Sequence, residues 1–194
     1  MKILKRILLV LAILLFVVTA IGLLLPSRVY VERSVNINKP QEMVFNYVNT
    51  INNWNKWSPW FELDTTASYT QEGPSSGQGA KLIWISENKD VGKGSMTFVE
   101  VEAPNKIKQA LNFMEEGVAT GTYSLETAES GTKFTWSLEF DTGFNPLLRI
   151  MGKFMDGMVG KDFEKGLNKL KSILESMPEP QLEVPVIVQD SIPS

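Results

Sequence analysis

Several short motifs in this 194-residue chain contain residue types that could do chemistry. Asp141-Thr142-Gly143 has the letters of the aspartic-protease triplet, but that chemistry needs two paired carboxylates and the chain has one copy. Gly92-Lys93-Gly94 lacks the spacing of a phosphate-binding loop and begins a predicted strand, which favours a bulge or bend. Glu100 and Glu139 fall within predicted strands, where solvated cross-strand positions explain them. We therefore assign no catalytic residue.

The chain contains no cysteine and no histidine. This composition excludes disulfides, thiolate nucleophiles, zinc sites built from cysteine or histidine, serine–histidine triads and imidazole acid–base catalysis. An enzyme built from this chain would have to use Asp, Glu, Lys, Tyr or Ser. The sequence therefore favours a non-catalytic protein without a metal or cofactor, and an enzyme stays open as the alternative.

One charged residue occupies a position that the predicted strand pattern turns inward. Arg33 shares the parity of Val31 and Val35, so on a regular strand it faces the interior, where an unpaired charge is costly. Two interpretations stay open. The arginine snorkels to solvent or forms a salt bridge near the end of the strand, or it is a polar anchor for an acidic or oxygen-rich ligand head group.

The element best suited to position a ligand is a long amphipathic helix predicted over residues 145–177, where apolar residues recur at three- and four-residue steps. Met151, Phe154, Met155 and Met158 are predicted to face the sheet, and glycines lie among them. Flexible methionines suit a core with irregular gaps, and equally the wall of a pocket that admits an apolar guest. The pattern predicts a pocket beneath the first half of the helix and ordinary packing beneath the second half.

The N-terminal segment predicts a membrane anchor. Ile7 to Leu25 is an uncharged apolar run of 19 residues, preceded by Lys2, Lys5 and Arg6. As a helix, this run spans about 28 Å, which matches one hydrocarbon core. The positive residues place the N-terminus in the cytoplasm and the remaining chain on the extracytoplasmic, periplasmic side. The alternative is a signal peptide cleaved after Val18-Thr19-Ala20.

The remaining chain predicts an α+β domain. Period-two alternation and turn signals give seven strands: 28–37, 66–71, 80–86, 92–101, 106–114, 118–127 and 132–141. After the first strand, a short helix is expected with Asn38 as N-cap and Pro40 in its first turn. The expected architecture is a curved antiparallel sheet of about seven strands wrapped on the C-terminal helix. The predicted organisation is an anchor over 1–27, the domain over 28–177 and a flexible tail over 178–194.

Three of the five tryptophans, Trp54, Trp57 and Trp60, occur at three-residue spacing. On one helical turn they would stack along one side. Large rings at this position would close one end of the core. The alternatives are an aromatic wall at a pocket mouth, or a foot at the bilayer interface, where tryptophan is enriched.

Several of these segments are similar to the START-like (SRPBCC, helix-grip) superfamily, and specifically to membrane-anchored bacterial members of its polyketide cyclase/dehydrase-like group. The similarity rests on seven segments: 31–40 (VERSVNINKP), 44–48 (VFNYV), 54–60 (WNKWSPW), 77–80 (GQGA), 92–95 (GKGS), 131–136 (GTKFTW) and 155–167 (MDGMVGKDFEKGL). The resemblance covers residues 28–175 and implies a helix-grip fold with an elongated apolar cavity. Relatives bind lipids, sterols, quinones, polyketides or hormones, and a minority are cyclases or hydrolases.

The expected function is binding or sequestration of an apolar small molecule of lipid, quinone or isoprenoid type beside a membrane. The predicted ligand-binding residues are Trp57, Trp60, Trp84, Met96, Phe98, Phe113, Tyr123, Trp136, Phe154, Met155, Met158 and Arg33. The alternatives are a cyclase- or hydrolase-like enzyme and a ligand-free interaction module. The net charge of −3 argues against nucleic acid as a partner, and the sequence leaves the oligomeric state open.

Overall fold

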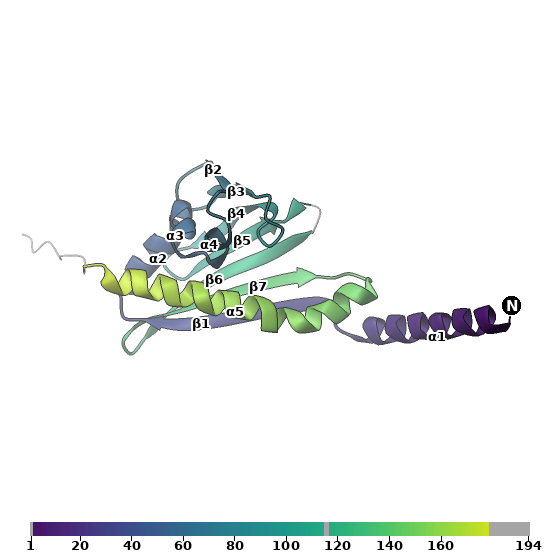
Figure 1. The fold of residues 1–194 in the computed structure, drawn as a ribbon. Coiled ribbons are helices and arrows are strands. Elements are labelled where there is room, and N and C mark those ends of the chain that lie inside the picture. Colours follow the sequence, from purple (N-terminus) through teal and green to yellow (C-terminus); the bar gives the residue numbers. More distant parts are fainter. Residues whose placement is uncertain (1, 115–116, 179–194) are drawn as a thin grey trace, which may run out of the picture.

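The computed structural model describes residues 2–114 and 117–178 and shows an α+β fold (Figure 1). The sheet contains seven strands: β1 (Arg28–Ile37), β2 (Ser68–Glu72), β3 (Lys81–Ile85), β4 (Lys93–Glu102), β5 (Lys106–Asn112), β6 (Val118–Ala128) and β7 (Gly131–Asp141). The helical elements are α1 (Lys2–Leu24), α2 (Gln41–Asn49), the 3₁₀ turn η1 (Ile51–Asn53), α3 (Trp54–Trp57), α4 (Pro59–Leu63) and α5 (Pro146–Ser176). The predicted tail, except Pro178, lies outside the described residues.

The strands form one antiparallel sheet in the order β1-β7-β6-β5-β4-β3-β2. Strands β2 to β7 follow one another as a meander, and β1 pairs with β7, so the first and last strands are neighbours. The sheet is open, with β1 and β2 at its edges. In Figure 1, α5 lies along the β1–β7 side of the sheet, whereas α2, α3 and α4 gather near one end of α5. The predicted fold class is confirmed.

The strands form where the sequence alternates. On β7, Phe134, Trp136 and Leu138 are buried while the residues between them are half-buried or exposed. This period of two gives the sheet one apolar face, and α5 packs against the β1–β7 side of that face. The strand bounds differ from the predicted ones by at most two residues. The chain bends at Gly92, just before β4, where the φ of this glycine is 62°. The register between β4 and β5 shifts further along, between Phe98 and Glu100.

The predicted N-cap of the short helix is wrong. Helix α2 begins at Gln41, and its N-cap is Pro40, whose side chain caps no backbone N–H. The backbone N–H of Asn38 instead donates to Glu175 Oε1 at 2.9 Å, which ties the end of β1 to the last turn of α5. Asn38 is therefore used for a long-range contact, which the local sequence pattern did not reveal.

Helix α5 begins at a capped turn. Asn145 Oδ1 accepts hydrogen bonds from the backbone N–H groups of Leu147 and Leu148, at 3.0 and 3.3 Å. Pro146 occupies the first helical position, where its fixed φ suits the helix and no N–H is needed. In the second half, Phe163 and Leu167, with Leu170 and Leu174, are buried against the sheet. The predicted packing of this half is therefore confirmed.

The predicted inward orientation of Met151 and Phe154 is wrong, because these side chains are 60% and 65% exposed. Glycines face β1 in their place. A Cβ built on Gly152 would lie 2.5 Å from Val29 Cγ2, and one on Gly160 would collide with the guanidinium of Arg33. Helix α5 can therefore lie close to the edge strand β1 because glycines face that strand, and its larger side chains point outward.

Helix α1 projects away from the domain as a separate rod (Figure 1). It is long and apolar enough to cross a membrane, and a signal sequence near the N-terminus has the same properties. Nearly all of its residues are exposed, and Gly22 is its single buried residue. Its C-terminal end contacts the start of α5.

Candidate functional site

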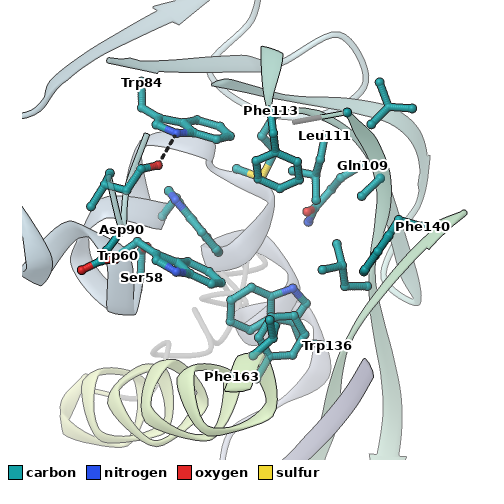
Figure 2. Close-up of a pocket in the computed structure, with 18 of the residues that line it drawn as sticks. Ser58, Trp60, Trp84, Asp90, Gln109, Leu111, Phe113, Trp136, Phe140 and Phe163 are labelled. Atoms are coloured by element: carbon teal, nitrogen blue, oxygen red, sulfur yellow. Dashed lines mark hydrogen bonds between the residues drawn. The ribbon is translucent and has the colours of Figure 1, made fainter. Parts of the chain in front are cut away.

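A cavity of about 490 Å³ lies between the inner face of the sheet, the short helices and α5 (Figure 2). Its volume falls within the range of small-molecule sites, and its wall is mostly apolar. The lining includes: Trp54, Ser58, Trp60, Tyr69, Trp84, Lys89, Asp90, Val91, Met96, Gln109, Leu111, Phe113, Gly117, Val118, Ala119, Trp136, Leu138, Phe140, Met155, Met158, Val159 and Phe163. The strands contribute mainly the alternating residues of their inner face, and α5 contributes four residues from its middle, between Met155 and Phe163.

Seven of the predicted ligand-binding residues line this cavity: Trp60, Trp84, Met96, Phe113, Trp136, Met155 and Met158. Trp57, Phe98 and Tyr123 lie outside the lining, each 1% exposed within the core. Phe154 points away from the sheet. The sequence parity identified the correct face of each strand, but it did not separate the residues beside the cavity from those packed behind them.

An aromatic cluster forms one wall of the cavity. The rings of Trp136 and Phe163 are stacked, with centroids 3.7 Å apart and planes 8° apart. Trp54 and Trp60 each meet Trp136 edge to face, at 5.3 and 5.8 Å, whereas Trp57 turns into the core. Such edge-to-face pairs are the favoured geometry for aromatic rings.

The three spaced tryptophans do not stack along one helix. Ser58 has an extended ψ of 127° and separates α3 from α4, which begins at Pro59. Trp57 helps to close the core, while Trp54 and Trp60 form part of the cavity wall. The core and wall interpretations therefore each describe part of this segment.

Two polar residues of the wall were missed by the sequence analysis. Gln109 and Ser58 are each 1% exposed. Gln109 Nε2 and Ser58 Oγ are buried and have no hydrogen-bond partner. Figure 2 shows the amide of Gln109 directed into the cavity. The alternation along β5 could have revealed Gln109, because it lies between the inward residues Ile107 and Leu111 and shares their parity.

Gln109 fits in the sheet because its cross-strand partner on β6 is a glycine. Gly121 pairs directly with Gln109, and a Cβ on Gly121 would lie 2.7 Å from Gln109 Oε1. Tyr123 lies one inward position further along β6, and its hydroxyl is also buried without a partner. Burial raises the pKa of Tyr123, so this phenol stays neutral.

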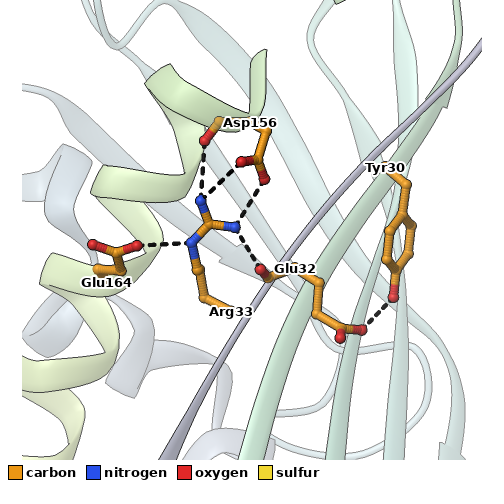
Figure 3. Close-up of polar contacts among 5 residues, drawn as sticks. All are labelled: Tyr30, Glu32, Arg33, Asp156 and Glu164. Carbon is orange, nitrogen blue, oxygen red and sulfur yellow. Dashed lines mark hydrogen bonds and ion pairs between the residues drawn. The ribbon is translucent and has the colours of Figure 1, made fainter. Parts of the chain in front are cut away.

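Arg33 belongs to an ion-pair cluster outside the cavity lining (Figure 3). Its guanidinium donates to both carboxylate oxygens of Asp156, at 2.8 and 3.1 Å, and to Glu164 Oε1 at 2.8 Å. A further bond reaches the carbonyl oxygen of Glu32. These contacts raise the pKa of Arg33, first through Asp156, and Arg33 in turn lowers the pKa of Asp156. The salt-bridge interpretation of Arg33 therefore describes the structure: the residue fastens α5 to β1.

A second charged cluster fastens α4 to α5. The carboxylate of Glu62 accepts from Lys165 Nζ at 2.7 Å and from Lys169 Nζ at 2.6 Å. These two hydrogen bonds lower the pKa of Glu62 to about 2, with Lys165 the larger cause. Because α4 carries Trp60, this cluster holds part of the cavity wall against the helix.

We expect the Glu62 contacts to be lost in acid. The pKa of Glu62 is lower in the folded than in the unfolded chain, so its ionised carboxylate stabilises the fold at a pH above the unfolded pKa of about 4.3. This contribution to the free energy of unfolding disappears as the pH falls towards about 2. Urea unfolding of the full chain in detergent should therefore show wild type more stable than Glu62→Gln at pH 7 and 5. The difference should shrink from pH 4.5 to 2.5. A difference that stays constant down to pH 2.5 would contradict this role.

The cavity opens to solvent at exposed members of its lining. Val118 is 72% exposed and Met158 is 66% exposed, and the charged side chains of Lys89 and Asp90 are also exposed. Lys89 and Asp90 are the only charged residues among the described lining residues. The mouth is therefore mixed in polarity, while the interior contains neutral groups alone.

Comparison with known proteins agrees with this geometry. The family model described as polyketide cyclase / dehydrase and lipid transport matches residues 28–175. No curated protein matches the chain.

Solved structures with the same fold share little sequence with this chain. Protein CV1439 from Chromobacterium violaceum is 14% identical, with a TM-score of 0.56 over 77% of this chain and 99% of that one. Protein SA2116 from Staphylococcus aureus is 13% identical, with a TM-score of 0.57 over 76% of this chain and 94% of that one. The di-domain ARO/CYC StfQ from the steffimycin biosynthetic pathway is 12% identical, with a TM-score of 0.60 over 76% of this chain and 51% of StfQ. At these identities the structures support the START-like helix-grip fold alone. Because the family model spans well over half of its length, the chain belongs to the polyketide cyclase / dehydrase and lipid transport family.

Proposed function

We propose that the protein binds and sequesters an apolar small molecule of lipid, quinone or isoprenoid type in the cavity beneath α5. The observation that carries this proposal is the cavity itself, which has a volume of about 490 Å³ and a mostly apolar wall. A cavity of this volume with a mostly apolar wall has the form of the sites that bind apolar small molecules.

The interior of the cavity favours a neutral ligand that carries an oxygen acceptor. Gln109 offers an unpartnered Nε2 at the wall, where a buried donor without a partner is costly. A carbonyl or ether oxygen on the ligand would accept from this group. A carboxylate is disfavoured, because Arg33 lies outside the lining and Lys89 is exposed at the mouth.

Binding is favoured over catalysis by the same lining. The cyclase- or hydrolase-like alternative needs polar groups gathered around a reacting atom. The buried polar side chains of the described wall are instead one amide and one hydroxyl, from Gln109 and Ser58. The other polar side chains of the lining, Tyr69, Lys89 and Asp90, are half-buried or exposed. The alternative of a ligand-free interaction module is disfavoured by the open space beneath α5.

The membrane context belongs to this proposal. We propose that α1 is retained as a single-pass anchor, with the domain of residues 28–177 on the periplasmic side. Lys2, Lys5 and Arg6 precede the apolar run and support this orientation. An anchored domain stays beside the membrane that holds apolar ligands of this kind.

The proposed ligand chemistry can be tested with a matched pair of probes. A long-chain methyl ketone and the alkane of equal chain length would compete against N-phenyl-1-naphthylamine fluorescence in the full chain in detergent. One net hydrogen bond predicts a preference of about 3- to 10-fold for the ketone over the alkane. Gln109→Leu should abolish this preference and keep alkane binding.

Gln78→Leu is the matched control, because Gln78 is exposed in the β2–β3 loop. It should retain the wild-type preference. An equal ketone preference in wild type and Gln109→Leu would contradict the role of Gln109. Displacement by neither probe in wild type would contradict apolar binding itself.

A further inference from the structure

The cavity mouth and α1 lie at the same end of the sheet. Strand β1 begins at Arg28, which pairs with Asp141 at the end of β7. Strand β6 runs antiparallel to β7, so its first residue, Val118, lies at this same end and pairs with Asn112. We call this the anchor end of the sheet. Because exposed Val118 belongs to the cavity lining, the mouth opens at the anchor end.

The joint between α1 and α5 is closely packed. A Cβ built on Gly22 would lie 2.5 Å from Pro146 Cβ and from the Pro146 carbonyl oxygen, so the two helix ends touch through the glycine. Arg149 Nη1 donates to the carbonyl oxygens of Leu23 and Leu25, at 2.9 and 3.2 Å. A cation bound to the last carbonyls of a helix satisfies groups that would otherwise lack partners. The start of α5 is therefore held at the point where the chain leaves α1.

Large apolar side chains are exposed around this joint. Phe144 is 88% exposed, and Leu147 and Met151 are each 60% exposed. We define the apolar rim as Val118, Phe144, Leu147, Leu148 and Met151. Phe144 also lies beside the guanidinium of Arg149, with 5.8 Å between the Arg149 Cζ and the ring centroid.

The rim continues along α5 to the cavity. Leu147, Met151, Phe154 and Met158 are four and three residues apart, so they share one face of the helix. Phe154 and Met158 are both exposed, and Met158 lines the cavity. At 1.5 Å per residue, this stripe covers roughly 16 Å from the joint to the mouth.

We propose that the apolar rim lies in the interface of the bilayer that α1 spans, and that the stripe along α5 is the path by which an apolar ligand passes between bilayer and cavity. Both parts rest on the proposed membrane anchor, and the second part rests also on the proposed ligand binding. Several large apolar side chains exposed at one end of a domain mark an interaction site. Its occupant is the lipid surface, because the joint with α1 holds the rim at the end of a membrane-spanning helix.

The absence of cysteine from the chain makes a direct test simple. Single substitutions Phe144→Cys and Leu147→Cys would carry an environment-sensitive fluorophore in the full chain, reconstituted into phosphatidylcholine vesicles containing spin-labelled lipid. Glu129→Cys is the control, because Glu129 is exposed in the β6–β7 turn at the opposite end of the sheet. Quenching at 144 and 147 should exceed quenching at 129 by about fivefold, as expected for side chains within the interface.

Two outcomes would overturn the interfacial position. Quenching at 144 and 147 as weak as at 129 would place the rim in water. Fluorophore self-quenching that rises with protein density, without lipid quenching, would assign the rim to a second copy of the chain.

The path along α5 needs a separate readout. Met151→Ser with Phe154→Ser should slow transfer of N-phenyl-1-naphthylamine from vesicles into the full chain by about tenfold, because polar side chains interrupt the stripe. At equilibrium in detergent, the double variant should bind as much N-phenyl-1-naphthylamine as wild type. An unchanged transfer rate would overturn the path, whereas failure of wild type to bind the probe would count against the proposed function.

Discussion

Ala119→Trp is expected to remove most ligand binding while leaving the protein folded. Ala119 lies on the inner face of β6 within the cavity lining, opposite Leu111. An indole at this position would occupy space that the ligand needs, so occupancy by an apolar ligand should fall at least about tenfold, which equals about 1.4 kcal/mol. The measurement is ligand content of the purified full chain by extraction and mass spectrometry.

The control for this prediction is Ala110→Trp. Ala110 lies on the neighbouring strand β5 but is exposed on the outer face of the sheet. The same substitution should therefore leave ligand content unchanged. Thermal unfolding of both variants would show whether the indole at 119 fits, because overpacking would cost about 1–3 kcal/mol. Undiminished ligand in a folded Ala119→Trp protein would contradict binding in this cavity.

Phe163→Ala is expected to cause the largest loss of stability among single substitutions in α5. Phe163 is 1% exposed and stacks on Trp136 at 3.7 Å between centroids. Removing a buried ring of this kind costs about 3–5 kcal/mol through lost burial and the cavity left behind. Denaturant unfolding of the full chain in detergent, followed by tryptophan fluorescence, would measure the change in the free energy of unfolding.

Leu147→Ala is the matched control on the same helix. Leu147 is exposed in the first half of α5, so its truncation should change the free energy of unfolding by less than about 0.5 kcal/mol. Equal destabilisation by the two substitutions would contradict the division of α5 into a packed half and an exposed half. A loss below about 1 kcal/mol for Phe163→Ala would contradict its role in the core.

The fold was predictable because its strongest signals are local and periodic. Alternation of Phe134, Trp136 and Leu138 identified β7 and its inner face, and the spacing of Leu167 and Leu170 identified the packed half of α5. A period of two or 3.6 follows directly from backbone geometry. The bounds of strands and helix therefore lay close to the predicted ones.

The site was only partly predictable, because the residues that were predicted wrongly or missed depend on long-range packing. Phe154 was placed inward by helical periodicity, but close contact of Gly152 with Val29 rotates α5 so that Phe154 points outward. Gln109 was missed although its parity turned it inward, because only its cross-strand neighbour Gly121 shows that an amide fits there. Such contacts join residues that are distant in sequence.

The division between wall and core has the same origin. Phe98 and Tyr123 have the parity of inward strand residues and are buried, yet both lie outside the cavity lining. Depth within a core depends on how α3, α4 and α5 meet the sheet. No single strand or helix contains that information.

We propose above all that the cavity beneath α5 holds an apolar small molecule. Native mass spectrometry of the full chain, released from a mild detergent after purification from the membrane fraction, tests it most directly. We expect a reproducible mass increment that organic extraction identifies as a neutral apolar molecule with a carbonyl or ether oxygen. The Ala119→Trp protein should lack this increment. A folded wild-type protein that is consistently free of any such molecule, and that takes none up from added lipid extract, would contradict the claim.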